Sequence, residues 1–350
     1  MSSWEKNIRK VVPYTPGEQP KRRDIIKLNT NENPYPPAPG VQKKLEEYNS
    51  EELRLYPDAC VSELVDTLAQ YYGVESDSVF VGVGSDDVLA MCFLTFFNSD
   101  KPVFFPDITY SFYDVWAELF HIKYDIKPLS DDFRIVKEDY MAPNGGIIFP
   151  NPNAPTGVLM DVSDIEDIIK ANSDSVVIID EAYIDFGGVS VLPLVSKYDN
   201  LLVVRTYSKS RSMAGSRIGF AIGDKKLIKY LNDCKYSFNS YTMDSLTIKL
   251  GAASIKDEKY FVDTLDRIIK TREWTKGELK RLGFEFPDSK SNFVFATHKT
   301  KSAEEIFEKL KEKGIYVRFF KKPRIDNYLR ITIGTDEEMK KLVEELEKLC

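Results

Sequence analysis

The sequence predicts an α/β protein with a mainly parallel central sheet, helices on both faces of that sheet, and a smaller α+β domain at its C-terminal end. From Val41 to about residue 245, short apolar or β-branched runs alternate with helical segments, as is typical of parallel strands joined by crossover helices. After residue 245 the pattern changes to a long charged helix followed by a compact set of strands and helices. A chain of 350 residues is long enough for one large and one smaller domain.

The chain is expected to divide into an N-terminal arm (1–45), a large domain (46–245) and a small domain (246–350). The arm is rich in proline, which excludes a continuous helix or a central strand there. Apolar residues lie beside the asparagine-rich stretch Leu28-Asn-Thr-Asn-Glu-Asn-Pro-Tyr. This combination indicates an extended arm that packs on the body.

The large domain should begin with a helix over 62–72, with Ser62 as its N-cap and Gly73 as its stop. Its predicted strands cover residues 79–83, 103–105, 146–149, 176–179, 201–205 and 218–222. The small domain is predicted to contain a helix over 257–282, a strand over 292–296, a helix over 303–313, strands over 316–319 and 328–333, and a closing helix from residue 336. In sheets of this class, binding sites form at the carboxyl ends of the strands.

Composition narrows the class of protein. A net charge of -7 argues against a general nucleic-acid binder, although a local basic pocket remains possible. The four cysteines form no CxxC pair and the two histidines have no second ligand at metal spacing, so neither a disulfide framework nor a metal site is expected. The N-terminus has no signal-like apolar stretch, and the longest apolar run, 88–97, is too short to span a membrane. A soluble cytoplasmic protein without a membrane partner is therefore expected.

The first chemical signal is a lysine at the end of a predicted strand. Lys209 follows the apolar run 201–204 in the segment Arg205-Thr-Tyr-Ser-Lys-Ser-Arg, and Arg217 lies eight residues later. Burial and neighbouring cations favour the neutral, nucleophilic form of a lysine amine, which can form a Schiff base. The arginine fork suits a phosphate. Taken alone, the segment could equally be a solvated basic loop.

The second signal is an acid at the end of another strand. In Val176-Val-Ile-Ile-Asp-Glu-Ala-Tyr the apolar run ends at Asp180, and Tyr183 follows. A carboxylate there could pair with a protonated pyridine nitrogen and make the ring an electron acceptor. The same pattern also fits a magnesium site of a nucleotide hydrolase. That alternative needs a GxxxxGK[ST] loop, which the sequence lacks.

Three weaker signals also fall at predicted strand ends. A glycine turn, Gly82-Val-Gly-Ser-Asp-Asp, leads into a helix near Ser85, and such a helix start can bind an anion. The segment Asn151-Pro-Asn-Ala-Pro-Thr-Gly is a rigid turn. Tyr110 could stack on a cofactor ring, although a single tyrosine is more often part of the core. The succession of these signals, each at a strand end, strengthens them together.

In this order the segments resemble the fold-type I aminotransferases that use pyridoxal 5'-phosphate, and more closely their histidinol-phosphate aminotransferase branch. The resemblance covers essentially the whole chain. It also includes Pro13-Tyr-Thr-Pro-Gly-Glu, Leu28-Asn-Thr-Asn-Glu-Asn-Pro-Tyr, Leu55-Tyr-Pro-Asp, and Tyr328-Leu-Arg-Ile-Thr-Ile-Gly-Thr. The lysine loop and the aspartate strand are typical of the fold type, whereas the arm and the last segment point to the branch.

The resemblance implies a role for each site residue. Lys209 would form the Schiff base and move protons, Asp180 would pair with the pyridine nitrogen, and Tyr183 would contact the ring oxygen O3'. The other implied cofactor contacts are Ser85, Asp86, Tyr110, Asn153, Ser208 and Arg217, with Tyr56 reaching the phosphate bound by the other subunit of a homodimer. The implied substrate contacts are Arg330, Arg318, Asn31 and Asn33.

The sequence departs from the family at one ring contact. The family usually reads Asn-Asn-Pro-Thr-Gly, and its second asparagine contacts O3', but this chain has Ala154 there. Either Tyr183 carries that contact alone or Asn153 replaces the missing amide. Asp87 stands where the family tends to have glutamate, with little expected effect.

The implied reaction is transamination between histidinol phosphate and 2-oxoglutarate in histidine biosynthesis, so the partners would be a small amino donor and a 2-oxo acid. Two alternatives share the fold: an aromatic amino acid aminotransferase and a threonine-phosphate decarboxylase. A non-catalytic regulator that binds pyridoxal phosphate is disfavoured, because such proteins carry a DNA-binding domain that an arm of about forty proline-rich residues cannot supply.

Overall fold

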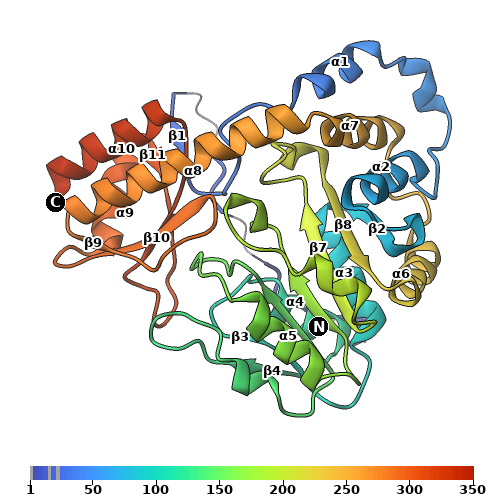
Figure 1. The fold of residues 1–350 in the computed structure, drawn as a ribbon. Coiled ribbons are helices and arrows are strands. Elements are labelled where there is room, and N and C mark those ends of the chain that lie inside the picture. The colour runs from blue at the N-terminus through green and yellow to red at the C-terminus, as the bar shows by residue number, and fades with distance from the viewer. Residues whose placement is uncertain (1–2, 15–16, 21–23) are drawn as a thin grey trace.

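The structure, a computed structural model, describes residues 3–14, 17–20 and 24–350. It confirms the α/β class, with a seven-stranded central sheet and a smaller domain beside it (Figure 1). In spatial order the large sheet contains β2 (Val79–Val83), β8 (Ile218–Gly223), β7 (Leu201–Thr206), β6 (Val177–Asp180), β5 (Gly146–Pro150), β3 (Val103–Pro106) and β4 (Tyr124–Lys127). Only β8 runs antiparallel to its neighbours, so the carboxyl ends of β5, β6 and β7 lie at one edge.

Helices cover both faces of the large sheet because alternate strand residues point to opposite sides. One face packs on α3 (Gly84–Phe96), α4 (Tyr113–Phe120) and α6 (Lys225–Phe238). The other face packs on α2 (Ser62–Tyr72), α5 (Val162–Ala171) and α7 (Ser245–Lys256), with α1 (Pro39–Glu47) outside them. In β5, for example, Ile148 faces the first set, whereas Ile147 and Phe149 face α5. The sheet is therefore buried on both faces.

The small domain has an antiparallel sheet with the order β12-β13-β10-β9. Its strands are β9 (Phe284–Glu285), β10 (Phe293–His298), β12 (Arg318–Phe319) and β13 (Leu329–Thr332), and its helices are α8 (Glu258–Arg281), α9 (Ala303–Glu312) and α10 (Asp336–Leu349). Short 3-10 segments cover Ser3–Asn7, Ser50–Arg54, Ser76–Ser78, Lys137–Tyr140, Ile184–Phe186, Leu192–Ser196 and Ala214–Ser216. One apolar cluster joins these helices and strands to Tyr183 and Phe186, which follow β6 of the large sheet. The two cores thus meet close to the predicted site.

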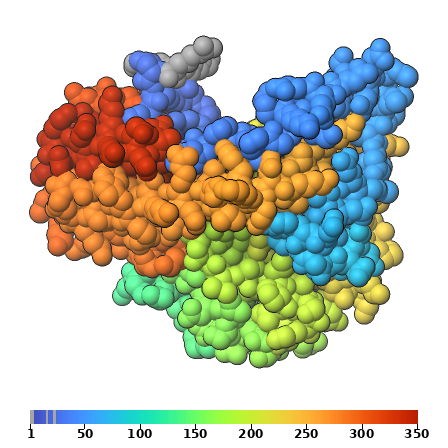
Figure 2. Space-filling model, turned by 45° about the horizontal axis from the view of Figure 1, so that its top comes forward, coloured from blue at the N-terminus to red at the C-terminus, as the bar shows by residue number. Residues whose placement is uncertain are grey.

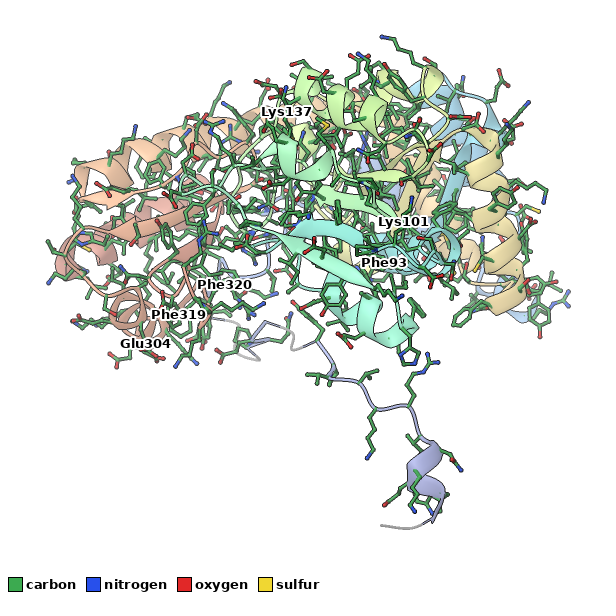
Figure 3. All side chains as sticks on the ribbon, turned by 90° about the horizontal axis from the view of Figure 1, so that it is seen from below. Phe93, Lys101, Lys137, Glu304, Phe319 and Phe320 are labelled. Carbon is green, nitrogen blue, oxygen red and sulfur yellow. The ribbon has the colours of Figure 1, made fainter. Side chains whose placement is uncertain are left out.

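The arm packs on both domains. Its strand β1 (Ile26–Lys27) pairs in parallel with β11 (Ile315–Tyr316) of the small domain. Further along, Gly40 donates to Asp257 and Tyr260 donates to the carbonyl of Pro36, so the arm lies along the start of α8 (Figure 2). The segment that contains residues 3–7 instead extends away from the body (Figure 3). Thr15 and Pro16 of the motif that begins at Pro13 lie outside the described residues.

Most predicted elements match within two residues, but two predictions need correction and other elements were missed. Ser62 is the first residue of α2 rather than its cap; the cap position is Val61 at φ 54°, and the Asp58 carboxylate accepts the Ser62 N–H. The strand predicted over 316–319 is two strands, β11 and β12, which belong to different sheets. The edge strand β4 was not predicted, because its sequence Tyr-Asp-Ile-Lys is half polar and carries no buried run.

The division of the chain at residue 245 stays a prediction. Helix α7, which begins at that point, packs through Ile248 and Leu250 with α2 of the large domain. The following helix α8 runs from there to the small domain (Figure 1). Within it, Arg272 donates to the carbonyls of Phe186 and Ser291 and so connects the two domains. Among the described residues, every helix is too short or too polar to cross a membrane.

Candidate active site

A cavity of about 170 Å³ lies at the carboxyl ends of the central strands. It is lined by Thr30, Glu32, Ser85, Asp86, Tyr110, Pro150, Ala154, Asp180, Ala182, Tyr183, Ser208, Lys209, Ala214 and Arg217. A second cavity of about 190 Å³ shares Thr30, Tyr110, Ala154, Tyr183 and Lys209 with the first. It adds residues of the arm and of the small domain, including Asn31, Arg318 and Arg330. The two cavities are therefore adjoining parts of one site.

Asp180 is the last residue of β6 and lies buried at the bottom of the first cavity. Its carboxylate accepts hydrogen bonds from the Tyr113 hydroxyl at 3.3 Å and from the Ala182 N–H at 3.1 Å. Burial nevertheless raises the pKa of Asp180 to about 7, and the negative charge of Asp86 acts in the same direction. An acid in this condition favours a cationic partner that would restore its ionised form.

Lys209 enters the cavity from the loop after β7, and the arm holds this loop. The Lys209 amine donates to the carbonyl of Thr30 at 3.3 Å. The Asn33 side chain donates to the carbonyls of Lys209 and Ser210 at 3.1 and 3.2 Å. Nearby, Asn31 donates to the Tyr183 hydroxyl at 2.9 Å. The asparagine-rich stretch therefore positions both the lysine and the tyrosine.

A second set of side chains forms a candidate anion-binding site at the start of α3. This helix begins at Gly84, so its first N–H groups have no carbonyl partner within the helix. Arg217, at the unusual φ of 51°, contacts Asp86 at 3.0 Å and Ser208 at 3.5 Å. A Cβ atom at Gly84 would lie 2.5 Å from the Arg217 guanidinium, so the glycine makes room for it. Tyr110 donates to Asp86 at 2.5 Å, and burial together with Asp86 raises the pKa of its phenol.

A buried ion pair supports the lysine loop from below. Arg205 in β7 contacts Glu181 at 2.8 Å, and Glu181 directly follows Asp180. Arg205 also contacts Asp185 at 3.4 Å, and Asp185 accepts a hydrogen bond from Ser210 at 2.6 Å. Because buried charges are stable only when they are paired and hydrogen-bonded, this network fixes the loop that carries Lys209 relative to the strand that carries Asp180.

The second cavity contains two arginines of the small domain. Arg330 on β13 donates to the carbonyl of Asn29 at 3.0 Å, and its Nε atom has no partner among the described residues. Burial lowers the pKa of Arg330 from its ordinary value, and the neighbouring Arg318 acts in the same direction. The aromatic ring of Phe320 lies within 6 Å of both guanidinium groups. Two cations beside an open cavity favour an anionic ligand.

Three of the predicted residues do not line these cavities: Asn33, whose side chain bonds the lysine loop, Asn153 and Tyr56. The Asn153 amide donates to the carbonyl of Ile108 and to Thr156, and its oxygen accepts from Thr109, so its side chain is already bonded elsewhere. Ala154 lines the cavities instead. Tyr56 is 84% exposed, and its ring meets that of Tyr241 in a tilted contact outside the cavities.

Sequence reasoning missed several residues of the site. Among them are Tyr14, Thr30, Glu32 and Phe320, which line the cavities, and Tyr113, which bonds Asp180. Tyr113 could not be distinguished from a core tyrosine by its position in α4. Thr30 directly precedes Asn31, and Glu32 lies between Asn31 and Asn33, so their place in the motif was the available signal.

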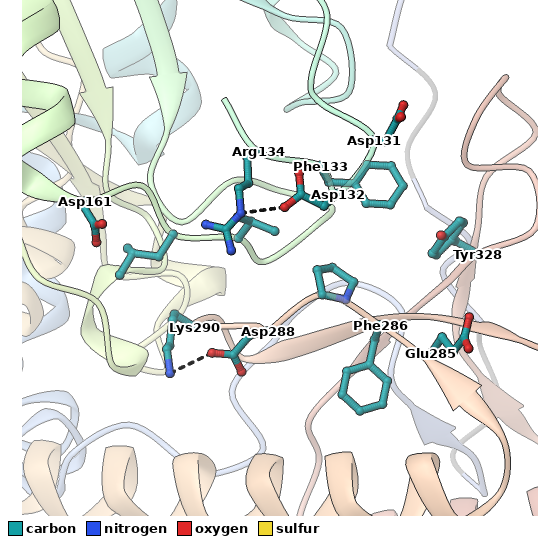
Figure 4. Close-up of a pocket in the computed structure, with 13 residues that line it drawn as sticks. Asp131, Asp132, Phe133, Arg134, Asp161, Glu285, Phe286, Asp288, Lys290 and Tyr328 are labelled. Carbon is teal, nitrogen blue, oxygen red and sulfur yellow. Dashed lines mark hydrogen bonds and ion pairs between the residues drawn. The ribbon is translucent and has the colours of Figure 1, made fainter. Parts of the chain in front are cut away.

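A larger hollow of about 450 Å³ lies elsewhere between the domains, lined by residues 131–134 and 285–290 (Figure 4). Its cations are paired locally: Arg134 contacts Asp132 at 2.7 Å and Lys290 contacts Asp288 at 3.1 Å. It therefore lacks the free cationic groups and the nucleophile that the first site combines.

The arrangement around Lys209 can bind a flat cationic ring with a phosphate. Asp180 would face the ring's positive nitrogen, Arg217 and the start of α3 would face the phosphate, and the Lys209 amine lies between them within reach of an aldehyde. The adjoining cavity would hold an anionic substrate against Arg318 and Arg330. This combination defines an enzyme that binds a phosphorylated aldehyde cofactor and works on amino groups.

Comparison with known proteins agrees with this class. Residues 23–346 match the model of the family "Aminotransferase class I and II". The chain is 54% identical to a histidinol-phosphate aminotransferase of Brachyspira hyodysenteriae over 97% of this chain and 96% of that protein, and 53% identical to one of Lactococcus lactis over 98% and 95%. A histidinol-phosphate aminotransferase of Sinorhizobium meliloti, solved with pyridoxal-5'-phosphate, has the same fold, with a TM-score of 0.85 at 22% identity over 94% of this chain and 92% of that one.

The chain therefore belongs to the class I and II aminotransferases. Within that family, the relatives that share about half of its residues are histidinol-phosphate aminotransferases.

Replacing Asp180 with asparagine should change how stability depends on pH in the ligand-free protein. The folded wild type holds a proton on Asp180 up to a pKa of about 7, whereas the unfolded chain releases it near pH 4. The contribution of Asp180 to the free energy of unfolding of the wild type should therefore fall as the pH rises from about 4 to about 7, by on the order of 4 kcal/mol in total. Denaturant unfolding of both proteins across this range should show that the free energy of unfolding of Asp180→Asn rises relative to that of the wild type as the pH increases. A difference that is constant with pH would contradict the raised pKa.

Proposed function

We propose that this protein transfers the amino group between histidinol phosphate and 2-oxoglutarate, with pyridoxal 5'-phosphate as its cofactor, in histidine biosynthesis. The observation that carries the proposal is the pair of adjoining cavities. One combines Lys209 with Asp180, and the other ends in Arg318 and Arg330. The identity of about one half to histidinol-phosphate aminotransferases over nearly the full chain supports the choice of substrate.

The residues of the first cavity fit the cofactor. A buried acid with a raised pKa suits a pyridinium nitrogen, and Arg217, Ser208 and the start of α3 suit a phosphate. Gly84 leaves the space that Arg217 needs. When bound, pyridoxal phosphate supplies an aldehyde and a ring that accepts the electrons left when the substrate's α-carbon loses a proton.

Each protein group then has a defined task. The Lys209 amine would hold the cofactor covalently between turnovers and, when released, would carry a proton to and from the substrate. Asp180 would keep the ring nitrogen protonated, since the pair restores the ionised carboxylate that burial disfavours. Asn31 would orient the Tyr183 hydroxyl toward O3'. With Ala154 in place of the family's asparagine and Asn153 bonded elsewhere, Tyr183 would make that contact without an amide.

The two substrates would use the same arginines in turn. Histidinol phosphate would place its phosphate, and glutamate a carboxylate, against Arg330 and Arg318, because a guanidinium fork binds either anion. Asn31 would line this pocket from the arm, whereas Asn33 would hold the loop that carries Lys209. The nearest alternatives are an aromatic amino acid aminotransferase and a threonine-phosphate decarboxylase, and a donor comparison separates all three.

The active unit would be a homodimer in the cytoplasm. Tyr56 is strongly exposed, and so are Leu53 and Leu55, which precede it, and Tyr241, which its ring contacts. A second copy covering this surface would bury them and would bring Tyr56 to the phosphate of the other site.

The substrate assignment can be tested by comparing donors. Histidinol phosphate should exceed histidinol by roughly ten- to a hundred-fold in kcat/KM, because histidinol lacks the charge-assisted contact to Arg330. Arg330→Ala should weaken both half-reactions, and Arg330→Lys should recover only part, since the fork is lost. Equal rates with histidinol, or a clear preference for phenylalanine, would favour the aromatic aminotransferase; release of CO₂ from threonine phosphate would favour the decarboxylase.

Borohydride reduction should attach the cofactor permanently to Lys209. Lys209→Ala should lose this label and nearly all activity, while Asp180 and Arg217 retain part of the noncovalent cofactor binding. Peptide mapping by mass spectrometry of the reduced wild type identifies the labelled lysine. A label on Lys225 or Lys226 instead would disprove the assignment.

The shared site predicts that two inactive variants restore each other. A mixture of Lys209→Ala and Tyr56→Ala chains should contain heterodimers in which one site carries both changes and the other carries neither. Activity of the mixture should therefore rise above the average of the two separate variants. Subunit exchange must be verified independently, for instance by native mass spectrometry. Exchange without recovery would mean that Tyr56 acts within its own chain.

A further inference from the structure

One arginine of the small domain is bound entirely by the large domain. Arg324 lies in the loop between β12 and β13, and its guanidinium contacts the Asp107 carboxylate at 2.8 Å. The same group donates to the carbonyls of Leu129 and Ser130, both at 2.9 Å. Together these contacts are called the Arg324 clamp below. A planar arginine that binds one carboxylate and two carbonyls fixes orientation as well as distance.

The clamp is built on backbone that is itself held in place. Asp107 follows β3, and its carboxylate also accepts the N–H groups of Ile108 and Leu129. Arg324 has a φ of 68°, which a non-glycine residue adopts only when its surroundings compensate the strain. In the described structure these compensating contacts come from the other domain. The conformation of the loop and the contact between the domains therefore depend on each other.

Both ends of the clamp lead directly to the substrate cavity. On the large-domain side, Asp107 stands three residues before Tyr110, and Thr109, Tyr110 and Ser111 line that cavity. On the small-domain side, the loop of Arg324 begins at Phe320, which lines the cavity beside Arg318 and Arg330. The clamp thus joins the two walls between which an anionic substrate would lie.

An apolar cluster continues the same contact. It combines Ile108, Leu129 and Phe133 of the large domain with Phe295 and Ile325 of the small domain. The ring of Tyr328 stacks on Phe295 at 4.6 Å and meets Phe133 edge to face at 5.3 Å. Phe133 and Tyr328 also line the hollow of Figure 4, which therefore marks where the contact between the domains ends on the solvent side.

We propose that Arg324 is a positioning residue for substrate binding: it fixes Arg318, Arg330 and Phe320 of the small domain relative to the Tyr110 loop of the large domain. The substrate identity used below rests on the proposed function, but the clamp itself rests on the contacts described here. Without the clamp, the small-domain wall would adopt the binding arrangement for only part of the time. The apparent affinity for substrate would then be multiplied by the fraction of time that the wall spends in the binding arrangement.

The test uses the cofactor-loaded enzyme and the variant Arg324→Asn. Asparagine tolerates positive φ but is too short to reach Asp107, so the loop backbone can keep its conformation. If the population of the binding arrangement falls to about one tenth, KM should rise roughly ten-fold, and by a similar factor for histidinol phosphate and for glutamate. The kcat should change by less than about two-fold. Hydrogen–deuterium exchange over residues 320–328 should become faster, whereas cofactor affinity should stay the same, because Asp180, Lys209 and Arg217 lie in the large domain.

Arg134→Asn is the matched control. Arg134 is an exposed arginine of the neighbouring loop, and it pairs with Asp132 of its own loop rather than across the domains. Its replacement should leave KM and the exchange of 320–328 unchanged. Arg324→Lys keeps the ion pair but cannot keep both carbonyl contacts, so its KM should lie between those of wild type and Arg324→Asn. If Arg324→Asn fails to fold, this lysine variant decides the question by the same measurements.

Three results would overturn the proposed positioning role of Arg324. They are an unchanged KM in Arg324→Asn, a loss confined to kcat, or an equal effect of Arg134→Asn. Each of these is distinct from failure of the proposed function. If wild type did not turn over histidinol phosphate, the substrate assignment would fail, and the comparison would be repeated with the donor that wild type does use.

Discussion

The site depends on one buried carboxyl group, that of Asp180, which forms no ion pair with any residue that the structure describes. Asp180 ends β6 inside the protein, and its two hydrogen bonds do not offset the cost of burying its charge. A cationic ring that enters the cavity offsets this cost. The Asp180 carboxylate is therefore stabilised in its ionised form when the ring is bound. The strand order makes the arrangement possible, since the parallel strands β5, β6 and β7 bring the Asn turn, the acid and the lysine loop to one edge. The neighbouring Glu181 differs from Asp180, because it forms an ion pair with Arg205 within the protein.

The strand ends of the site could be predicted from the sequence because each follows an uninterrupted apolar run. The run 201–204 shortly before Lys209 and the run 176–179 directly before Asp180 are of this kind, and in a parallel sheet the relative position of the two residues follows from the fold class. The resemblance to a family added Arg330, Arg318 and Tyr56, which no local pattern distinguishes from other surface or strand residues.

What could not be predicted depends on contacts between distant segments. The direction of the Asn153 side chain is decided by Ile108, Thr109 and Thr156, so its sequence position beside Ala154 was not informative. Tyr113 and Arg324 are further examples, since the partner of each lies on another element. The short strands β1 and β4 also escaped prediction, because two or four partly exposed residues carry too weak a period.

The pairing of the arm with the small domain has a consequence for the order in which the molecule can be completed. Asn31 exchanges hydrogen bonds with Thr332, 301 residues away in sequence, and its carbonyl accepts one from Asn292. During synthesis on the ribosome, Asn31 emerges long before its partners, which follow 261 and 301 residues later. The large sheet can assemble while translation continues, but the arm must wait until the small domain has been made. The cavity that holds Lys209 is therefore open on the arm's side until then, and catalytic competence arrives when the arm packs rather than with the domain that carries the lysine.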